Sequence, residues 1–418
     1  MSIFIKDVLL RDKRRTNIFI DGNIIKSVGS IIKDADTIID GTSMLALSPF
    51  YNMHTHAAMT LFRGYAEDLP LMEWLQSYIW PKEAKLTEED VYNGARLACL
   101  EMIKSGTVFF MDMYWHLAGT YRAVEEMGLR ANLSSVLIDN FDKKNAEDTK
   151  KRCKEEVFEF SDKNERISIA LGPHAIYTVS TELLQWAGDF AKEKNLLYHI
   201  HLSETEFEVN ECIKKHRCRP FEYMDKLGIL SPETYAAHSN WLSEKEIALI
   251  ADSNAKAIAN PVSNMKLVSG RTCPIIALEN AGATVLLGTD GCSSNNNLDM
   301  MEEMKIAAIL QKHFSGKNTN MPAEHILHVT TKFPPSAMGI NAGQIAPGKL
   351  ADIILLNLNI PEARPLHDPV SNIVYSMNGS SVDTMICNGE ILMQNRKVPK
   401  EEEIIRKAEE SAFKIIQT

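Results

Sequence analysis

The sequence lacks the features expected of a membrane, secreted or nucleic-acid-binding protein. No uninterrupted apolar stretch reaches the ~20 residues that are needed to span a bilayer. The first residues, MSIFIKDVLLRDKRR, interrupt their apolar run with Lys6 and Asp7, so they lack the continuous apolar region of a signal peptide. The formal net charge of −10 argues against a nucleic-acid surface, because phosphate binding requires a basic face. We therefore expect a cytoplasmic protein with neither membrane nor nucleic acid as a partner.

Cysteine is sparse and shows no motif. The seven cysteines are odd in number, no CxxC motif occurs, and only Cys212 and Cys218 lie close together in the sequence. This pattern argues against a disulfide framework or a cysteine-rich zinc site and indicates reduced thiols. Low-complexity segments and short repeats are also lacking, and 45% hydrophobic with 24% charged residues is typical of a globular chain.

Short strand-like segments alternate with longer helical patterns through most of the chain. The segment EEDVYNGARLACLEMIKSG spaces its apolar residues at helical intervals and ends at Gly106. Eight strand candidates occur: LALSPFYNMHTH, TVFFMDMY, RANLSSVLID, ISIALGPHA, LLYHIHLSE, TYAAHS, AKAIANP and ATVLLGTD. Eight strands with helical spacers predict an α/β fold, a (β/α)8 TIM barrel, and 418 residues suit such a barrel of about 250 residues plus a smaller unit.

Both ends of the chain consist of strands and turns instead. Near the N-terminus, Asp21-Gly22 separates two apolar segments as in a hairpin. After about residue 346, PGKLADIILLNLN and VDTMICNGEILMQNRKV repeat this pattern, and the charged helical segment KEEEIIRKAEESAFKII follows. We predict that residues 1–49 and 346–418 form the two parts of a small β-sandwich with a terminal helix, and that residues 50–345 form the barrel.

Histidines and carboxylates gather at the predicted carboxyl ends of the strands, where (β/α)8 barrels carry their functional residues. The pair His54 and His56 shares one strand face, which alone is only a weak indication of a metal site. Further candidates at later strand ends are His174, His199, His201, Glu204, His238 and Asp290. Three imidazoles and one carboxylate suit a catalytic Zn²⁺ that keeps a position open for water and lowers the pKa of that water to about 7.

The chain resembles the amidohydrolase superfamily through an ordered set of motifs: HTHAAMTLFRGYAEDLPLMEWLQSYIWPKEAKLTEEDV, HLSETEFEV, AAHSNW, NPVSNMKL, LLGTDGCSSNNNLDM and PGKLADIILL. More narrowly, these motifs are similar to those of the 5-methylthioadenosine/S-adenosylhomocysteine deaminase group, which is related to the triazine hydrolases. The resemblance covers most of the chain. It implies a distorted (β/α)8 barrel, a β-sandwich built from both termini and one divalent metal per chain, usually zinc.

The resemblance also implies a role for each site residue. The metal ligands would be His54, His56, His201 and Asp290. His201 is preferred to His199 because the family's HxxE motif falls on His201 and Glu204, and we expect His199 to pack or to support the ligands. Glu204 would shuttle protons, His238 would orient the attacking hydroxide, and Asp290 would also take a proton from the water. Glu83 would hold the ribose hydroxyls and His174 would contact the purine.

The implied reaction is hydrolytic deamination of an adenosine-type nucleoside: 5-methylthioadenosine, S-adenosylhomocysteine, 5'-deoxyadenosine or adenosine. Water attacks C6, Glu204 protonates N1, and a second proton helps ammonia to leave, which yields the inosine analogue. Two alternatives stay open. One is an amidohydrolase that deaminates or dechlorinates another heterocycle, such as guanine, a cytosine-like ring or an s-triazine. The other is a catalytically silent scaffold, against which the intact set of ligands argues. A homo-oligomer fits the resemblance.

Two residue types that the family uses are missing from their expected strands. The fourth strand, IALGPHAIY, has no lysine of the kind that binuclear members carboxylate, so we expect a mononuclear site. The third strand, RANLSSVLID, has Ser134 and Ser135 where members acting on adenosylhomocysteine carry an arginine, a residue that can grip a carboxylate through two hydrogen bonds. We expect no other arginine to replace it and therefore predict an uncharged 5' group, such as methylthio or deoxy.

Several other segments have a structural interpretation. We expect His116, His325 and His328 to be surface or packing residues and LPLMEWL to be an apolar lid or core segment. The Asn-Pro and Ser-Asn pairs of NPVSNMKL predict a loop. The run EEEIIRKAEE is typical of a solvated amphipathic helix.

Overall fold

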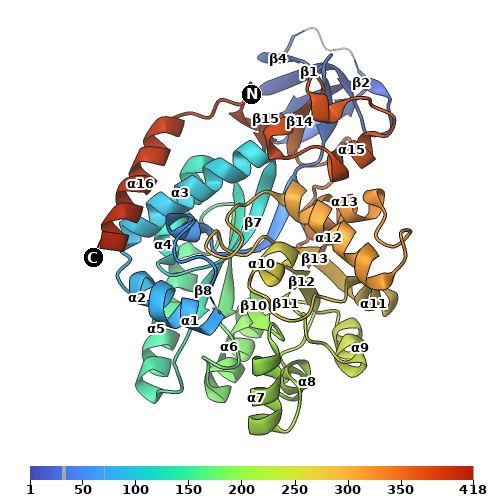
Figure 1. The fold of residues 1–418 in the computed structure, drawn as a ribbon. Helices are drawn as coiled ribbons and strands as arrows, with labels where there is room; N and C mark the ends of the chain where they lie inside the picture. Colours follow the sequence, from blue (N-terminus) through green and yellow to red (C-terminus); the bar gives the residue numbers. More distant parts are fainter. Residues whose placement is uncertain (31–33, 70, 418) are drawn as a thin grey trace.

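A computed structural model describes residues 1–30, 34–69 and 71–417. It confirms the predicted (β/α)8 TIM barrel, whose strands form the centre of the molecule in Figure 1. Eight parallel strands follow one another in chain order around the barrel. They are β6 (Phe50–Thr55), β7 (Thr107–Met113), β8 (Arg130–Leu137), β9 (Ile167–Pro173), β10 (Leu197–Leu202), β11 (Thr234–His238), β12 (Lys256–Ala259) and β13 (Thr284–Leu287).

Helices surround the barrel strands. After β7 to β12 these are α4 (Leu117–Met127), α5 (Lys143–Phe160), α6 (Thr181–Lys194), α7 (Glu206–His216), α8 (Pro220–Lys226), α9 (Glu244–Ser253), α10 (Pro261–Lys266) and α11 (Ile275–Asn280). After β13 come α12 (Met300–Ser315), α13 (Ala323–Thr331) and α14 (Phe333–Ala337). Helix α3 (Glu88–Ser105) begins at the capping box of Thr87 and Asp90 and ends at Gly106, whose φ of 88° explains why glycine stops the helix there.

The first and last barrel strands are joined by side chains and backbone at their carboxyl ends. Oδ1 of Asn52 accepts a hydrogen bond from the backbone N–H of Thr289 at 3.0 Å, and Nδ2 of Asn52 donates to Oγ1 of Thr289 at 2.7 Å. The backbone N–H of Asp290 donates to the carbonyl of His54 at 3.0 Å. Barrel closure therefore places the predicted ligand Asp290 directly beside the predicted ligand His54.

The two chain ends meet in a second, mixed sheet, seen at the top of Figure 1. Its strands are β1 (Ser2–Leu9), β2 (Arg15–Asp21), β3 (Ile24–Val28), β4 (Thr37–Asp40), β5 (Met44–Leu47), β14 (Ile353–Asn357), β15 (Val382–Cys387) and β16 (Glu390–Met393). Strand β5 pairs with β14 in antiparallel fashion, and β2 with β3 around the predicted Asp21-Gly22 turn. Burial of Ile3, Ile5 and Ile353 gives this sheet its own apolar core. Domain boundaries at 49/50 and 345/346 stay a prediction.

The last helix, α16 (Glu401–Gln417), lies along α3 (Figure 1). Its buried face includes Ile404 and Ala408, while Glu402 and Glu403 are exposed, so the predicted amphipathic helix is confirmed. The remaining short helices are η1 (Ala57–Phe62), α1 (Leu71–Trp74), η2 (Leu75–Ile79), α2 (Trp80–Glu83), η3 (Pro361–Ala363), α15 (Pro369–Tyr375) and η4 (Gly379–Ser381). Among the described residues, no helix has both the length and the apolar character that crossing a membrane requires.

One local prediction is wrong. The segment NPVSNMKL forms the helix α10 instead of a loop, because Pro261 occupies the first turn, where the missing N–H has no helical partner to lose. The predicted reduced thiols agree with the structure, in which all seven cysteines are free and buried. In LPLMEWL, Pro70 lies outside the described residues, while Trp74 is buried and Leu75 is half-buried.

Candidate active site

The carboxyl ends of the barrel strands border a cavity of about 650 Å³. A volume of this size falls in the range of about 300–1,000 Å³ that small-molecule sites occupy. The predicted site residues on its wall are His56, Glu83, His174, His201, Glu204, His238 and Asp290. His54 is completely buried and contacts several of them. The structure therefore brings all the residues predicted for the site together.

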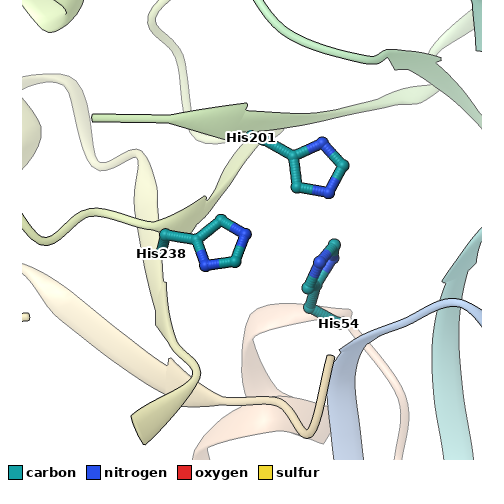
Figure 2. Close-up of side chains that lie close together, drawn as sticks. All are labelled: His54, His201 and His238. Atoms are coloured by element: carbon teal, nitrogen blue, oxygen red, sulfur yellow. The ribbon is translucent and has the colours of Figure 1, made fainter. Parts of the chain in front are cut away.

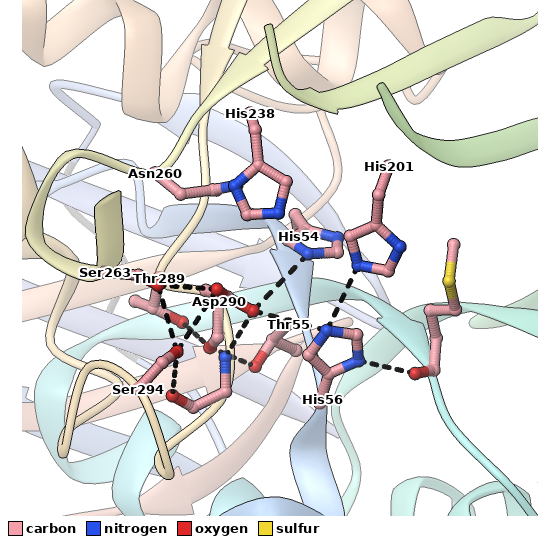
Figure 3. Close-up of polar contacts among 12 residues, drawn as sticks. His54, Thr55, His56, His201, His238, Asn260, Ser263, Thr289, Asp290 and Ser294 are labelled. Atoms are coloured by element: carbon pink, nitrogen blue, oxygen red, sulfur yellow. Dashed lines mark hydrogen bonds and ion pairs between the residues drawn. The ribbon is translucent and has the colours of Figure 1, made fainter. Parts of the chain in front are cut away.

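Three imidazoles and one carboxylate converge at the carboxyl ends of the barrel strands (Figure 3). Nε2 of His56 lies 3.3 Å from Oδ1 of Asp290 and 3.3 Å from Nε2 of His201. Nε2 of His54 lies 3.6 Å from Oδ1 of Asp290. His54 and His56 reach this point together because residues i and i+2 of β6 share one face of the strand.

His238 belongs to the same cluster. Figure 2 shows the rings of His54, His201 and His238 directed toward a common point. One nitrogen of each ring lies within 4.8 Å of the others. His238 was predicted to act on the water and not to bind the metal. Its position gives it access to either role, so the cluster offers one more candidate ligand than the sequence suggested.

The second ring nitrogen of each of the three strand-end ligands has its own partner. Nδ1 of His56 donates to the carbonyl of Met113 at 2.6 Å, and Nδ1 of His201 donates to the carbonyl of His174 at 2.7 Å. Nδ1 of His54 lies 2.9 Å from Nε2 of His199. Such contacts orient a ligating histidine and keep Nε2 free for a metal. His199 thus has the supporting position expected for it.

A divalent cation fits this cluster. Nε2 of His54 is buried and makes no hydrogen bond with any described residue, which is the state of a nitrogen that lacks its ligand. Burial lowers the pKa of His54 to about 4, so the ring is neutral, as metal binding requires. Burial also works against ionisation of Asp290, but His54 and His56 outweigh it and hold the pKa of this carboxyl well below its usual range. The donor set of imidazole nitrogens and one carboxylate suits zinc.

The backbone around Asp290 is built to hold its carboxylate. Asp290 has a φ of 62°, an unfavourable value for a residue with a Cβ, and such strain often marks functional sites. Oδ2 accepts hydrogen bonds from Ser263 Oγ at 2.6 Å and Ser294 Oγ at 3.2 Å (Figure 3). Oδ1 accepts a hydrogen bond from the backbone N–H of Gly291 at 2.8 Å. These donors leave Oδ1 turned toward His54 and His56.

Glu204 lies just after β10, in a segment whose backbone is held by the buried side chain of Glu208. Glu208 accepts hydrogen bonds from the backbone N–H groups of Ser203 at 2.9 Å and Glu204 at 2.8 Å. Nδ2 of Asn240 donates to the carbonyl of Glu204 at 3.2 Å. Burial raises the pKa of the Glu204 carboxyl, which favours its holding a proton, and Oε2 lies 3.9 Å from Nε2 of His238. This position suits an acid and base next to the metal cluster.

Two side-chain amides orient His238 at the ring nitrogen that does not face Glu204. Its Nδ1 lies 2.9 Å from the amide of Asn264 and 3.3 Å from that of Asn260. Asn264 lies on α10, the helix that was predicted to be a loop. The two amides hold the imidazole so that Nε2 faces Glu204.

The other wall of the cavity carries Glu83 and His174. Tyr114 donates a hydrogen bond from its hydroxyl to Oε1 of Glu83 at 2.7 Å, while burial raises the pKa of this carboxyl. Nδ1 of His174 lies 2.9 Å from Oγ1 of Thr178, and burial lowers the pKa of His174 to about 3, so this ring is neutral. Trp74 and Leu75, from the segment predicted as lid or core, also line the cavity.

The remaining histidines partly follow their predicted roles. His325 bonds Oε1 of Glu279 at 2.7 Å and His328 lies 2.9 Å from Nη1 of Arg11, both away from the cavity, as expected for surface or packing residues. His116 is exposed, as expected for a surface residue, and it also lines the cavity. Its Nε2 bonds the carbonyl of Leu86 at 2.9 Å.

An arginine that was not expected at the site reaches the cavity from the helix that follows the third strand. Arg152 of α5 lines the cavity. Ser134 lies 3.1 Å from Nδ1 of His199 in the barrel interior, and Ser135 donates to Glu156. The strand residues on the cavity wall are instead Val136 and, just after β8, Ile138. Arg152 was missed because its place depends on how α5 packs against β8, which the strand pattern does not reveal.

Comparison with known proteins agrees with this arrangement. Residues 47–392 match the family described as the amidohydrolase family. The chain is 47% identical to a protein of Methanospirillum hungatei named 5'-deoxyadenosine deaminase, over 98% of this chain and 93% of that protein. It is 46% identical to a protein of the same name from Methanothermobacter thermautotrophicus, over 96% of this chain and 95% of that one.

Solved structures have the same fold. The crystal structure of an adenosine deaminase from Xanthomonas campestris with bound zinc matches with a TM-score of 0.93 and 29% identity, over 100% of this chain and 98% of that one. An atrazine chlorohydrolase from Arthrobacter aurescens, complexed with zinc, matches with a TM-score of 0.90 over 98% of this chain and 100% of that one. At 20% identity, the second likeness shows the fold alone.

Proposed function

Because the chain belongs to the amidohydrolase family, we propose that it is a hydrolytic deaminase of adenosine-type nucleosides with one zinc ion per chain. The observation that carries the proposal is the convergence of His54, His56, His201 and Asp290 beside the buried carboxyl of Glu204, in a cavity of about 650 Å³. Relatives that are 46–47% identical and named 5'-deoxyadenosine deaminase support the substrate class.

In this proposal, the ion would be held by His54, His56, His201 and Asp290 through the side-chain atoms that face one another, Nε2 of the three histidines and Oδ1 of the aspartate. Zinc supplies Lewis acidity that makes a water molecule acidic enough to ionise near pH 7. The backbone and serine donors that surround Asp290 keep its carboxylate in place, so that it can also accept a proton from the attacking water. His238, held by Asn260 and Asn264, orients the water from the side of Glu204.

Glu204 performs the proton transfers to the base. Since burial raises its pKa, the carboxyl can arrive protonated and donate to N1 of the adenine ring as C6 is attacked. It then carries a proton to the leaving amino group. The bonds from Ser203 and Glu204 to Glu208 limit the freedom of this segment, which favours a fixed distance between the carboxyl and the ring.

Glu83 and His174 bind the substrate. Glu83, fixed by Tyr114, accepts hydrogen bonds from the ribose hydroxyls, and neutral His174 contacts the purine. Members of the substrate class differ in the 5' group, and we propose that small uncharged groups, deoxy or methylthio, are preferred. The alternatives of another heterocycle or a non-catalytic scaffold lack a comparable observation in their favour.

The test is a side-by-side rate comparison of 5'-deoxyadenosine, 5-methylthioadenosine, adenosine and S-adenosylhomocysteine, followed by ammonia release and by the ultraviolet change from adenine to hypoxanthine. The zinc-loaded protein should turn over the first two fastest. Glu204→Gln and Asp290→Asn should lose activity by at least about a hundredfold, in line with the usual contribution of an acid–base group. The matched control is Glu206→Gln, an exposed glutamate two residues from Glu204. Full activity in both site variants would contradict the mechanism.

Two broader predictions remain to be tested. A cytoplasmic location is proposed from the seven free cysteines, which fit a reducing compartment. A homo-oligomer is proposed from the resemblance to the family, and light scattering of the purified protein measures it.

A further inference from the structure

We propose that Glu156 sets the preference of the cavity for uncharged 5' groups by pairing with Arg152. This inference rests on the proposed deaminase function and identifies the residue that selects among its substrates. Both side chains line the same cavity as the metal cluster. The structure assigns them to neighbouring turns of α5, four residues apart.

Two nitrogens of the Arg152 guanidinium, Nη1 and Nη2, bond to groups of the protein. Nη1 lies 3.1 Å from Oε1 and 3.0 Å from Oε2 of Glu156, and Nη2 donates to the carbonyl of Val136. Glu156 has an additional donor, because the buried hydroxyl of Ser135 bonds its Oε2. Glu156 is the less accessible partner, with 16% of its side chain exposed against 38% for Arg152.

In the proposed binding mode, the 5' group of the nucleoside contacts the cavity wall that carries this pair. The metal cluster and Glu204 define the place of the adenine ring, and Glu83 that of the ribose. We place the 5' group at the wall formed by β8 and α5, where Val136 and Ile138 are apolar lining residues. Arg152 and Glu156 together add no net charge to this wall.

The pairing decides which 5' groups bind well. A substrate carboxylate would have to compete with Glu156 for Nη1 of Arg152, and it would also lie near the negative charge of Glu156. An uncharged group meets neither cost, because it leaves the ion pair intact. Removing the charge of Glu156 while keeping its size would leave the positive charge of Arg152 unbalanced, and removing the charge of Arg152 would leave the negative charge of Glu156.

Three nucleosides with 5' groups of similar length test this charge balance: 5'-carboxymethylthio-5'-deoxyadenosine, its primary amide and the 5'-(2-aminoethyl)thio analogue. In Glu156→Gln, the kcat/KM ratio of acid to amide should rise about two- to fivefold at low salt, as expected for a partly exposed charge. The ratio of amine to amide should fall by a similar factor. In Arg152→Met both ratios should move in the opposite directions, and added salt should weaken all four changes.

Glu155→Gln is the matched control, because Glu155 lies on the same helix, is exposed and loses the same charge. Its ratios should equal those of the unmodified protein. Unchanged ratios in both Glu156→Gln and Arg152→Met, with the amide still turned over, would overturn the role of the pair and leave the deaminase function standing. A zinc-loaded, unmodified protein that turns over neither 5'-deoxyadenosine nor any of the three nucleosides would overturn both.

Discussion

Nε2 of His199 lies 2.9 Å from Nδ1 of His54, in the buried interior of the barrel. On its other side, Nδ1 of His199 lies 3.1 Å from Oγ of Ser134. Burial lowers the pKa of His199 well below its usual range, so the ring is neutral and can accept at Nε2 while donating at Nδ1. The hydrogen bonds that link Ser134, His199 and His54 thus place the proton of His54 on Nδ1 and leave its Nε2 free for the metal.

The first prediction removes this support. His199→Leu keeps the site apolar but deprives Nδ1–H of His54 of its acceptor. Zinc affinity should fall about 10- to 100-fold, the usual cost of losing the partner of a ligating histidine. Competition with a chromophoric chelator measures the affinity. Ser134→Ala removes only the hydrogen bond between Ser134 and His199 and should have a smaller effect on zinc affinity. Equal zinc affinities for the unmodified protein and both variants would show that the contact of His199 with His54 does not support the metal.

The second prediction concerns the hydroxyl of Tyr114 on Glu83. Burial raises the pKa of Glu83, and the hydrogen bond from Tyr114 works in the opposite direction. Tyr114→Phe should therefore raise this pKa further, so that the carboxylate needed for ribose binding forms only at higher pH. The acid limb of the pH profile of kcat/KM should shift to higher pH. KM at neutral pH should rise about tenfold, which corresponds to ~1.4 kcal/mol for the loss of a hydrogen bond to a charged group.

A second substrate serves as the control for Tyr114→Phe. A 2',3'-dideoxy analogue lacks the hydroxyls that Glu83 is proposed to bind, so its kcat/KM should change little in the variant. An equal loss for both substrates would place the effect of Tyr114 elsewhere than on ribose binding.

The third prediction is a pH dependence of stability that originates at Glu208. Burial raises the pKa of this carboxyl from an ordinary 4.5 to about 8, despite the two backbone N–H groups that favour its ionised form. Between these pH values the folded protein binds more protons than the unfolded chain, so the free energy of unfolding falls as pH rises. Relative to Glu208→Gln, the unmodified protein should lose up to about 1.4 kcal/mol for each pH unit in this window.

Urea unfolding at several pH values from 5 to 8 measures this difference. The variant is expected to lose one of the two acceptors for Ser203 and Glu204 at every pH, so the informative quantity is the slope and not the absolute stability. Glu206→Gln, a change at an exposed position of the same helix, should give a curve parallel to that of the unmodified protein. Parallel curves for Glu208→Gln as well would contradict the assignment.

The parts of the fold that depend on local chemistry were predictable from the sequence. The β-rich segments of the barrel, the stop of α3 at Gly106 and the hairpin at Asp21-Gly22 follow from side-chain periodicity and turn preferences, which act between near neighbours. His54 and His56 were predictable as a pair for the same reason, since a strand fixes the direction of alternate side chains.

The parts that depend on packing between distant segments were not predictable in this way. Arg152 and Glu156 have the spacing of an ordinary ion pair on a solvated helix, and only the docking of α5 against β8 turns them toward the cavity. The segment around Pro261 was ambiguous, because proline suits both a loop and the first turn of a helix. The approach of His238 to His54 likewise depends on the closure of the whole barrel.

The final prediction concerns the junction between the barrel and the sheet of the chain ends. Arg130 at the start of β8 donates from Nε to Oδ2 of Asp352 at 2.9 Å and from Nη2 to Oδ1 at 3.2 Å. The side chains are only 5% and 1% exposed, so the ion pair is desolvated. Arg130→Met should destabilise the fold by about 3–5 kcal/mol, because the carboxylate of Asp352 is left buried without its cation.

Combining Arg130→Met with Asp352→Asn distinguishes the contribution of the ion pair to stability from that of packing. Since the cost arises from an unpaired charge, adding Asp352→Asn to Arg130→Met should recover part of the lost stability, measured as the free energy of unfolding in urea. Arg122→Met is the matched surface control, because the partner Glu89 is exposed, and it should cost at most about 1 kcal/mol. Zinc content per folded chain should stay the same in all these variants, since none of the residues belongs to the metal cluster. Additive losses in the double variant would mean that Arg130 stabilises the junction through packing alone.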